Sequence, residues 1–471
     1  MASVDTLHAE YELAAVKWLR MRDVISGQDA IHARGTAYLP RLSEQTDPDY
    51  AAYKLRASWF GATSRTVDAL HGLMFRKAPV IEAPEGMAGI LDDLTLAGQS
   101  AEGFIASLGR ESLEVGRGGV LVDYPAVRDQ PGSLGAAEAS GLRPFATLYK
   151  AESIINWRSE RIDNRMTLTL VVLAETHEEW EPDAFEPTTV PQFRVLRLDD
   201  GRYVQEVYRG GDKGLERVET VTPMMRGRSM SFIPFVIVGP EQIGPEISDP
   251  PLIDMADLNL SHYRTTADLE HGAHYAGLPM LMLAGVTTAE GEKIAIGSQT
   301  AVVSDNPAAK GFYIEFSGQG LGSLERLIER KEAQMAALGA SMLAAPRKGV
   351  EAADTHEMRT VQETSALADI AGTVSQAMTM VLGWVRDWAG LSGDVSVEVS
   401  TDYVVTQLTA QQLTALLGAW QAGAISRATL FWNLQQGELV APGKTVDDEQ
   451  SEIDAEGPRP GMETGAAEEQ A

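Results

Sequence analysis

The chain of 471 residues contains no cysteine. This absence excludes a disulfide framework, a thiolate metal site and a cysteine nucleophile, and it is compatible with a reducing compartment. The sequence also lacks any apolar run close to the roughly 18 residues that a membrane-spanning helix requires. Its first residues do not show the basic and then apolar order of a signal peptide. We therefore expect a soluble protein, made in the cytoplasm, that has no contact with a membrane.

Positive charge is also scarce. The chain has 39 lysines and arginines against 67 aspartates and glutamates, a formal net charge of −28. Tight binding to nucleic acid or to an anionic membrane requires clustered basic side chains, so this composition argues against both. Part of the excess lies in residues 447–471, where nine acidic residues accompany one arginine. We expect a disordered acidic tail there, which serves either solubility or the binding of a partner.

Fragments that resemble catalytic or metal-binding motifs are incomplete. PGKT at residues 442–445 lacks the glycine that a phosphate-binding loop needs five residues before Gly443. The glycine-rich turn at residues 318–323 does not lead into a strand with an acidic ligand for ribose. His271 and His274 stand three residues apart and could share a metal ion, but the sequence indicates no third ligand. The sequence therefore gives no positive case for an enzyme, a metal or a cofactor.

Helical periodicity dominates the first third of the chain and strand patterns the part that follows. The predicted helices cover residues 11–24, 49–75 and 100–115, and Gly61 and Gly72 are candidate interruptions of the second. Ser100 is suited to cap the last of these helices and Gly116 to end it. Residues 145–238 are rich in β-branched and alternating segments, and Asp199-Asp200-Gly201 predicts a hairpin turn between two strands.

Two long amphipathic helical patterns then enclose a short strand-rich insert. They cover residues 250–277 and 322–346, with strands expected at 278–283, 300–304 and 311–316. We expect Asp249 to cap the first helix, with two prolines in its opening positions. The second helix has an apolar stripe on a charged surface, which is typical of lateral packing. The stripe consists of Leu324, Leu327, Ile328, Met335, Leu338 and Met342. A third long pattern covers residues 361–388.

Several segments follow one another in a particular order along nearly the whole chain, and this order is more specific for a protein family than any one segment. They are TVDALHGLMFRKAPVI at residues 66–81, GRGGVLVDYP at 116–125, IPFVIVGP at 233–240, the two long helices, and QAGAISRATLFWNLQQGELV at 421–440. This order resembles the portal proteins of tailed bacteriophages, and more closely a portal-like family of phages and prophages. The acidic end of the chain is similar to the ending of that family.

The resemblance implies an α+β fold with the portal architecture. By position, the N-terminal region and wing are residues 1–250, the first stem helix 251–276, the clip 277–322, the second stem helix 323–345, the tunnel loop 346–355, a long wing helix 356–390, the crown 391–448 and the acidic tail 449–471. Such proteins form a ring, usually of twelve subunits, at one capsid vertex of the virion. Double-stranded DNA passes through the ring during packaging and ejection. The implied partners are the terminase large subunit, a major capsid or scaffolding protein and a head–tail adaptor, with no enzymatic activity and no cofactor.

The acidic composition suits a conduit, because each retained phosphate contact would oppose the sliding of DNA. We hypothesise that Arg347 and Lys348 in the tunnel loop make sparse, transient and sequence-independent DNA contacts; the alternative is an ordinary solvated loop. We also hypothesise that Arg326 and Arg330 pair with acidic residues of a neighbouring subunit. The remaining members of this predicted subunit interface are Leu324, Leu327, Met335 and Leu338.

Two other classes of function stay open at this stage. One is another structural protein of a phage head or its adaptor, with a different ring size. The other is a metal-dependent hydrolase that uses the dispersed acidic and histidine residues. A soluble monomer with metal-dependent turnover would favour the hydrolase, and a uniform ring with a central hole would favour the portal.

Overall fold

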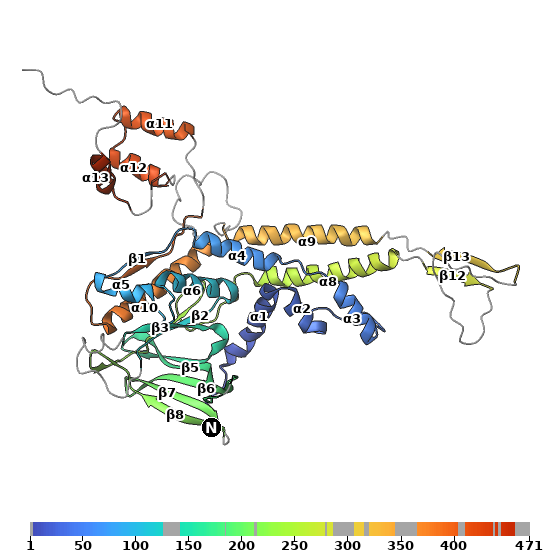
Figure 1. Ribbon diagram of the computed structural model, residues 1–471, viewed down its shortest axis with the longest axis horizontal. Coiled ribbons are helices and arrows are strands. Elements are labelled where there is room, and N and C mark those ends of the chain that lie inside the picture. Colours follow the sequence, from blue (N-terminus) through green and yellow to red (C-terminus); the bar gives the residue numbers. More distant parts are fainter. Residues whose placement is uncertain are drawn as a thin grey trace, which may run out of the picture. The chain divides into compact units, whose positions relative to one another are not determined.

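A computed structural model describes residues 3–125, 142–183, 185–211, 214–277, 280–285, 306–314, 320–343, 365–403, 410–436, 439–440 and 444–456 (Figure 1). The chain divides into two compact units, Met1–Thr401 and Asp402–Ala471. The first unit contains both helices and sheets, and the predicted α+β class is confirmed. No helix in the described ranges combines the length and the apolar character needed to cross a bilayer.

The N-terminal part is helical. Its elements are α1 (Ala9–Ser26), α2 (Gln28–Arg34), the short η1 (Gly35–Ala37), α3 (Asp47–Arg56) and α4 (Ala62–Met74). The helical pattern over residues 49–75 forms two helices, and the chain turns between α3 and α4. Of the two glycines expected to interrupt the pattern, Gly61 stands at the beginning of α4, whereas Gly72 lies inside that helix. Ala57 adopts an extended conformation, and the carbonyl of Phe60 accepts a hydrogen bond from Asn259. A tertiary contact therefore interrupts a segment whose periodicity is helical throughout.

Helix α6 (Ala101–Val115) leads into the central three-stranded sheet. The Ser100 side chain accepts a hydrogen bond from the Gly103 N–H, and Gly116 ends the helix at φ 71°, so both predicted caps are confirmed. A Cβ atom at Gly116 would also lie 3.1 Å from the Asp249 carbonyl oxygen. Two smaller helices, η2 (Glu85–Met87) and α5 (Ala88–Asp92), precede α6.

The central sheet is antiparallel, in the order β11-β2-β3. Its strands are β2 (Gly118–Asp123), β3 (Phe145–Lys150) and β11 (Phe235–Val238). Nearly all of β2 and all of β11 are buried, as the apolar sequence predicts. Gly119 is required in β2, because a Cβ atom there would lie 2.4 Å from the ring of Phe235.

A second sheet is an antiparallel meander in the order β4-β5-β6-β7-β8. Its strands are β4 (Ile154–Ile162), β5 (Arg165–Glu179), β6 (Thr188–Asp199), β7 (Arg202–Gly211) and β8 (Gly214–Val221). The η3 turn (Ala151–Ser153) joins it to β3, and β9 (Met224–Met225) pairs with β10 (Arg228–Ser229) after it. The predicted hairpin turn is confirmed: Asp199 pairs with Arg202, while Asp200 and Gly201 both have positive φ.

The two sheets meet through a buried polar cluster around Glu175. Its carboxylate accepts hydrogen bonds from the Tyr149 hydroxyl at 2.6 Å and from Arg194 Nε at 2.8 Å. Burial raises the pKa of Glu175, but the hydrogen bond and charge of Arg194 outweigh burial and hold the pKa below its usual value. The opposite face of the meander packs Ile155, Val172 and Val195 against the N-terminal segment.

Three long helices follow β11. They are α8 (Ile253–Ala276), α9 (Leu321–Ser341) and α10 (Ala366–Trp388), with the hairpin of β12 (Met280–Ala284) and β13 (Lys310–Ile314) between the first two in sequence. The predicted strand at residues 300–304 and the beginning of the third pattern at 361–364 lie outside the described residues. Asp249 does not cap α8, which begins at Ile253 without a side-chain cap; instead Asp249 pairs with Lys17 at 2.5 Å.

The boundary between the two compact units lies after Thr401, and the beginning of the crown at residue 391 stays a prediction. Strand β14 (Ser396–Glu398) pairs with β1 (Val80–Glu82), which places it in the first unit. The second unit contains α11 (Ala410–Gln421), α12 (Arg427–Gln436) and α13 (Val446–Glu456). Helix α13 covers the first part of the predicted acidic tail. Thr445 caps this helix: the Thr445 hydroxyl accepts a hydrogen bond from the Asp448 N–H, and the Asp448 carboxylate accepts one from the Thr445 N–H.

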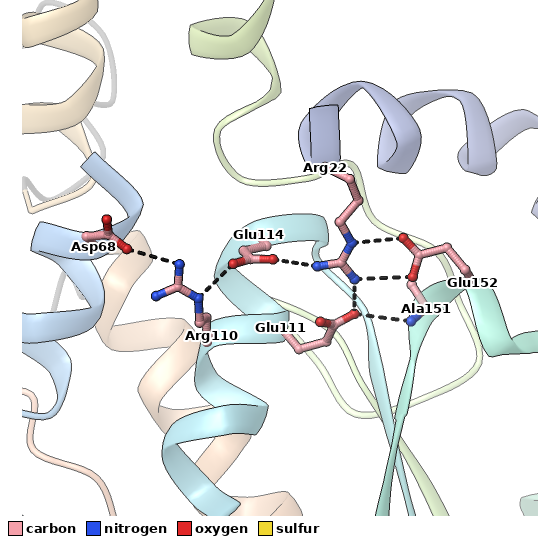
Figure 2. A network of polar contacts seen from close by, with 7 residues as sticks. All are labelled: Arg22, Asp68, Arg110, Glu111, Glu114, Ala151 and Glu152. Atoms are coloured by element: carbon pink, nitrogen blue, oxygen red, sulfur yellow. Dashed lines mark hydrogen bonds and ion pairs between the residues drawn. The ribbon is translucent and has the colours of Figure 1, made fainter. Parts of the chain in front are cut away.

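A polar network around Arg22 joins four elements of the first unit (Figure 2). Arg22 on α1 forms ion pairs with Glu111, with Glu114 at 2.5 Å and with Glu152 at 2.9 Å. Glu111 also accepts a hydrogen bond from the Ala151 N–H at 3.2 Å. Burial raises the pKa of Glu111 even though Arg22 lowers it.

The network continues from α6 to α4. Glu114 accepts a second hydrogen bond from Arg110 Nε at 2.8 Å, and Arg110 pairs with Asp68 on α4 at 3.0 Å (Figure 2). Helices α1, α4 and α6 and the η3 turn are therefore held together by two guanidinium groups.

Replacing Arg22 with Met should lower the free energy of unfolding by about 3–5 kcal/mol, because Glu111 and Glu114 stay buried without Arg22. Urea unfolding followed by circular dichroism measures this effect. The matched control is Lys17→Met on the same helix, whose ion pair with Asp249 is exposed and should contribute less than about 1 kcal/mol. A second variant, Arg22→Met with Glu111→Gln, should recover part of the loss. Equal costs for Arg22→Met and Lys17→Met would contradict the role given to the network.

Candidate functional site: the long helix pair

Helix α8 is packed on several sides for most of its length. It contacts α1, α3 and α4 of the N-terminal part as well as α9. Figure 1 shows α9 running along one side of α8 and α1 meeting it from the other. The buried side chains of α8 lie between Met255 and Ala267, and those of its last turn are more exposed. The first two thirds of α8 are therefore fixed within the chain.

Polar contacts fasten α8 to the N-terminal helices. The buried Asn259 side chain accepts hydrogen bonds from the Thr63 N–H at 3.2 Å and hydroxyl at 3.0 Å, and it donates to the Phe60 carbonyl at 2.8 Å. Further along, Asp268 accepts a hydrogen bond from the Tyr53 hydroxyl at 2.6 Å. Burial, and then the hydrogen bond to Asp268, raise the pKa of Tyr53. The oxygen and the nitrogen of the Asn259 amide thus both have partners between Phe60 and Thr63, which fixes the orientation of this side chain.

A lysine lies in the middle of the surface that α9 turns toward α8. The side chain of Lys331 is buried, and its ammonium group donates to the Ser261 carbonyl at 2.8 Å and to the Thr265 hydroxyl at 2.6 Å. Burial lowers the pKa of Lys331, and the nearby Arg264 and Arg330 lower it further. Beside it, His262 Nε2 lies 3.2 Å from the carboxylate of Glu332. These contacts fix the position of one long helix along the other.

The structure divides the predicted subunit interface into two faces. Met335 is only 1 % exposed, and Leu324, Leu327 and Leu338 are half-buried, on the side of α9 that faces its own chain. Arg326 and Arg330 are exposed on the opposite side, where Arg326 donates to the Ser323 hydroxyl. Met335 is thus already covered within one chain, whereas the two arginines are available to a partner. Arg347 and Lys348 lie outside the described residues.

His271, the first histidine of the pair on α8, has an environment that disfavours a cation. Arg56 lies 3.4 Å from the Nδ1 atom of His271, and the rings of Tyr53 and Tyr275 contact the same imidazole edge-on. Partial burial, followed by the charge of Arg56, lowers the pKa of His271. Within the described ranges, no three histidine or acidic side chains come together as metal ligands.

The hairpin between the long helices carries exposed apolar side chains. Met282 on β12 and Phe312 on β13 are directly paired across the strands, and both are exposed. A two-stranded hairpin has little stability of its own in water. Such a pair is suited to contact with another protein surface.

Sequence reasoning missed the polar residues that position the helix pair. Lys331 stands three and four residues from Ile328 and Met335. Helical spacing therefore places Lys331 in the apolar stripe, and a lysine in such a stripe indicates a buried ammonium group with hydrogen-bond partners. Asn259 carried no such signal, because its partners lie about 200 residues away in sequence.

Comparison with known families and proteins gives one partial match. A family model described as a domain of unknown function, DUF4055, matches residues 251–389. This stretch contains α8, the hairpin, α9 and α10, and it is less than a third of the chain. No curated protein matches the sequence.

Solved structures of gene transfer agent particles are similar over most of the chain at low identity. A chain in the virion of the native particle is 12 % identical, with a TM-score of 0.38, over 86 % of this chain and 97 % of that one. A chain in the neck of the empty particle, computed with C6 symmetry, is 15 % identical, with a TM-score of 0.40, over 80 % and 90 %. A chain in the native neck, computed with C12 symmetry, is 12 % identical, with a TM-score of 0.39, over 79 % and 89 %.

Replacing Thr265 with Val should lower the free energy of unfolding by about 1–3 kcal/mol, because the buried ammonium of Lys331 loses an acceptor. Replacing Lys331 itself with Met should be neutral or stabilising by about 1 kcal/mol, since an apolar side chain then completes the stripe. Thermal and urea unfolding measure both. Thr266→Val is the matched control, because the Thr266 hydroxyl donates within its own helix to the His262 carbonyl. Equal costs at the two threonines would show that Lys331 does not depend on Thr265.

Proposed function

We propose that this chain is the portal, or head-to-tail connector, protein of a tailed phage or of a phage-like particle. It forms a ring at one capsid vertex and surrounds the path of double-stranded DNA during packaging and ejection. The observation that carries the proposal is the helix–hairpin–helix unit, in which two long helices are locked together and carry a hairpin between them in sequence. The order of segments along the chain, from the buried strand β2 to the helices of the second unit, supports the same reading.

The helix pair has the properties of a rigid wall. Helix α8 has 24 residues and α9 has 21, which correspond to about 36 Å and 32 Å at 1.5 Å per residue. Asn259 and Lys331 fix these helices to the body of the chain and to each other. In the proposed ring the pair is the stem. The hairpin then belongs to the clip, where its exposed Met282 and Phe312 would meet the terminase large subunit or a head–tail adaptor.

The charge of the chain suits a conduit more than a clamp. With a net charge of −28, a channel surrounded by many copies would hold DNA weakly at every point. In this proposal the wing corresponds to the sheets of the first unit and contacts a major capsid or scaffolding protein. The second unit corresponds to most of the crown. The ring has twelve subunits in the arrangement that the resemblance implies.

Negative-stain electron microscopy and mass photometry of the purified full-length protein test the proposal. We expect uniform rings with a central hole.

Changing both Arg326 and Arg330 to Glu should strongly reduce the fraction of protein in rings, because two exposed positive charges on α9 become negative in an acidic assembly. The control with the same change in charge is Arg165→Glu with Arg202→Glu, at exposed ends of the meander. A protein that stays monomeric at all concentrations and shows metal-dependent turnover would refute the proposal.

Replacing Arg347 and Lys348 together with Ala should reduce the amount of DNA per particle while the rings stay intact. The physical reason is the loss of the transient phosphate contacts that we propose for these two side chains. Quantitative PCR of nuclease-protected DNA in purified particles measures the effect. Arg165→Ala with Arg202→Ala serves as the control. Normal packaging by the Arg347 and Lys348 variant would remove both residues from the proposed channel.

A further inference from the structure

Helix α1 carries large apolar side chains on two opposite faces. Trp18 and Met21 are completely buried on its inner face. On its outer face, Leu13, Val16 and Leu19 are 77 %, 60 % and 45 % exposed. Their spacing of three residues aligns them in one stripe along the helix, together with the exposed Ala9. This stripe, Ala9, Leu13, Val16 and Leu19, is called the α1 outer face below.

A surface helix normally has one apolar face and one polar face. Scattered exposed leucines are ordinary, but an aligned stripe on a helix whose other face is already buried indicates a second packing partner. The rest of the chain does not supply this partner within the described residues, since all three side chains stay exposed there. The proposed ring supplies further copies of the same chain.

Helix α9 has a surface that fits the α1 outer face. Arg326, Ala333 and Ala340 are exposed and stand seven residues apart along the outside of α9. Arg330 and Ala337 lie beside them, also exposed. This α9 outer face is therefore charged in its first half and consists of alanines in its second half. Alanines leave room for larger side chains from another helix to approach closely.

The two faces are placed for contact between subunits. Both α1 and α9 pack against α8, and Figure 1 shows them on opposite sides of it. One chain therefore cannot bring its own α1 outer face to its own α9 outer face. A ring is built from head-to-tail contacts, in which two different surfaces of the same chain meet across each boundary.

Charge selects the relative direction of the two helices. Lys17 and Arg20 of α1 are already paired with Asp249 and Asp257 in the same chain. Glu12 has no ion pair within the described ranges, and neither has Arg330. Ala9 and Val16 on the α1 outer face are seven residues apart, as are Arg326, Ala333 and Ala340 on the α9 outer face. If Val16 lies opposite Ala333 in a parallel arrangement, Glu12 lies near Arg330 and Leu19 near Ala337.

We propose that the α1 outer face of one subunit packs in parallel against the α9 outer face of the next subunit, with Glu12 paired to Arg330. This inference rests on the proposed ring, and it adds which two surfaces meet at each boundary. It also gives Arg330 of α9 a definite partner, Glu12 on a neighbouring α1 helix.

The absence of cysteine from the chain allows a direct test in the full-length protein. Val16→Cys and Ala333→Cys are introduced together, and the protein is oxidised and run on a non-reducing gel. We expect a ladder of cross-linked oligomers that ends at the ring size. Each single-cysteine variant should stay monomeric on the gel. The control pair is Val16→Cys with Leu55→Cys, because Leu55 is exposed on α3 but is not part of either face.

The outcomes separate this inference from the proposed function. Rings seen by microscopy without a ladder overturn the proposed contact and leave the portal proposal standing. Dimers from Val16→Cys alone also overturn it, because they show that two α1 helices meet. If the protein forms no rings and gives no ladder at any concentration, both proposals are contradicted. The double variant Leu13→Glu with Val16→Glu gives a further outcome. If it forms rings normally but these rings fail to enter particles, the α1 outer face binds another virion protein and the inference is overturned.

A charge exchange tests the direction of the helices. Glu12→Arg alone should reduce the fraction of protein in rings, because it faces Arg330, and Glu12→Arg with Arg330→Glu should restore it. The matched control is Glu10→Arg with Arg330→Glu, since Glu10 lies away from the α1 outer face and should give no recovery. Equal recovery from both pairs, or from neither, would overturn the parallel arrangement.

Discussion

The guanidinium of Arg22 is the constraint on which the arrangement of the first unit depends. Glu111 and Glu114 come from α6, and Glu152 comes from the η3 turn between the sheets. The buried carboxylates of Glu111 and Glu114 require a cation, and α1 must therefore lie where its arginine reaches them and Glu152 (Figure 2). Such a cluster adds little net stability compared with a well-packed apolar core, but it permits few alternative positions. Because α1 also packs on α8, the network fixes the helix from which one proposed boundary surface projects.

The same use of polar groups continues along the long helices. An apolar stripe alone would tolerate a slide of α9 along α8 by one turn, about 5.4 Å. Lys331 opposes this slide, because its ammonium group would lose the hydrogen bonds to the Ser261 carbonyl and the Thr265 hydroxyl and would stay buried without partners. Asn259 has the same effect between α8 and the turn before α4. The polar residues thus set the register, and the apolar residues supply most of the packing.

Local features of the fold could be predicted from the sequence, whereas features set by distant partners could not. Ser100, Gly116 and the turn at Asp200 act through neighbouring residues, and each was predicted correctly. The exact place of the break between α3 and α4 and the pairing of Asp249 with Lys17 depend on residues roughly 200 positions away. Strand β1 pairs with β14 across more than 300 positions. The candidate site follows the same division. Periodicity identified the apolar stripe of α9, but it could not tell whether α8 of the same chain or a neighbouring subunit covers Met335.

Many arginines find a carboxylate partner in their own chain, which has 67 acidic and 39 basic side chains. Those of the first unit do so repeatedly: Arg22, Arg34, Arg110, Arg143, Arg194 and Arg217 all pair with carboxylates. Within the described ranges, Arg326 and Arg330 have no such pair, although several glutamates share their helix. Arg165 and Arg202, at the ends of the meander, are in the same condition, so the lack of a pair does not by itself identify a partner. The α9 arginines differ in their place on the outside of the proposed stem, where the proposed ring brings the carboxylates of the next copy.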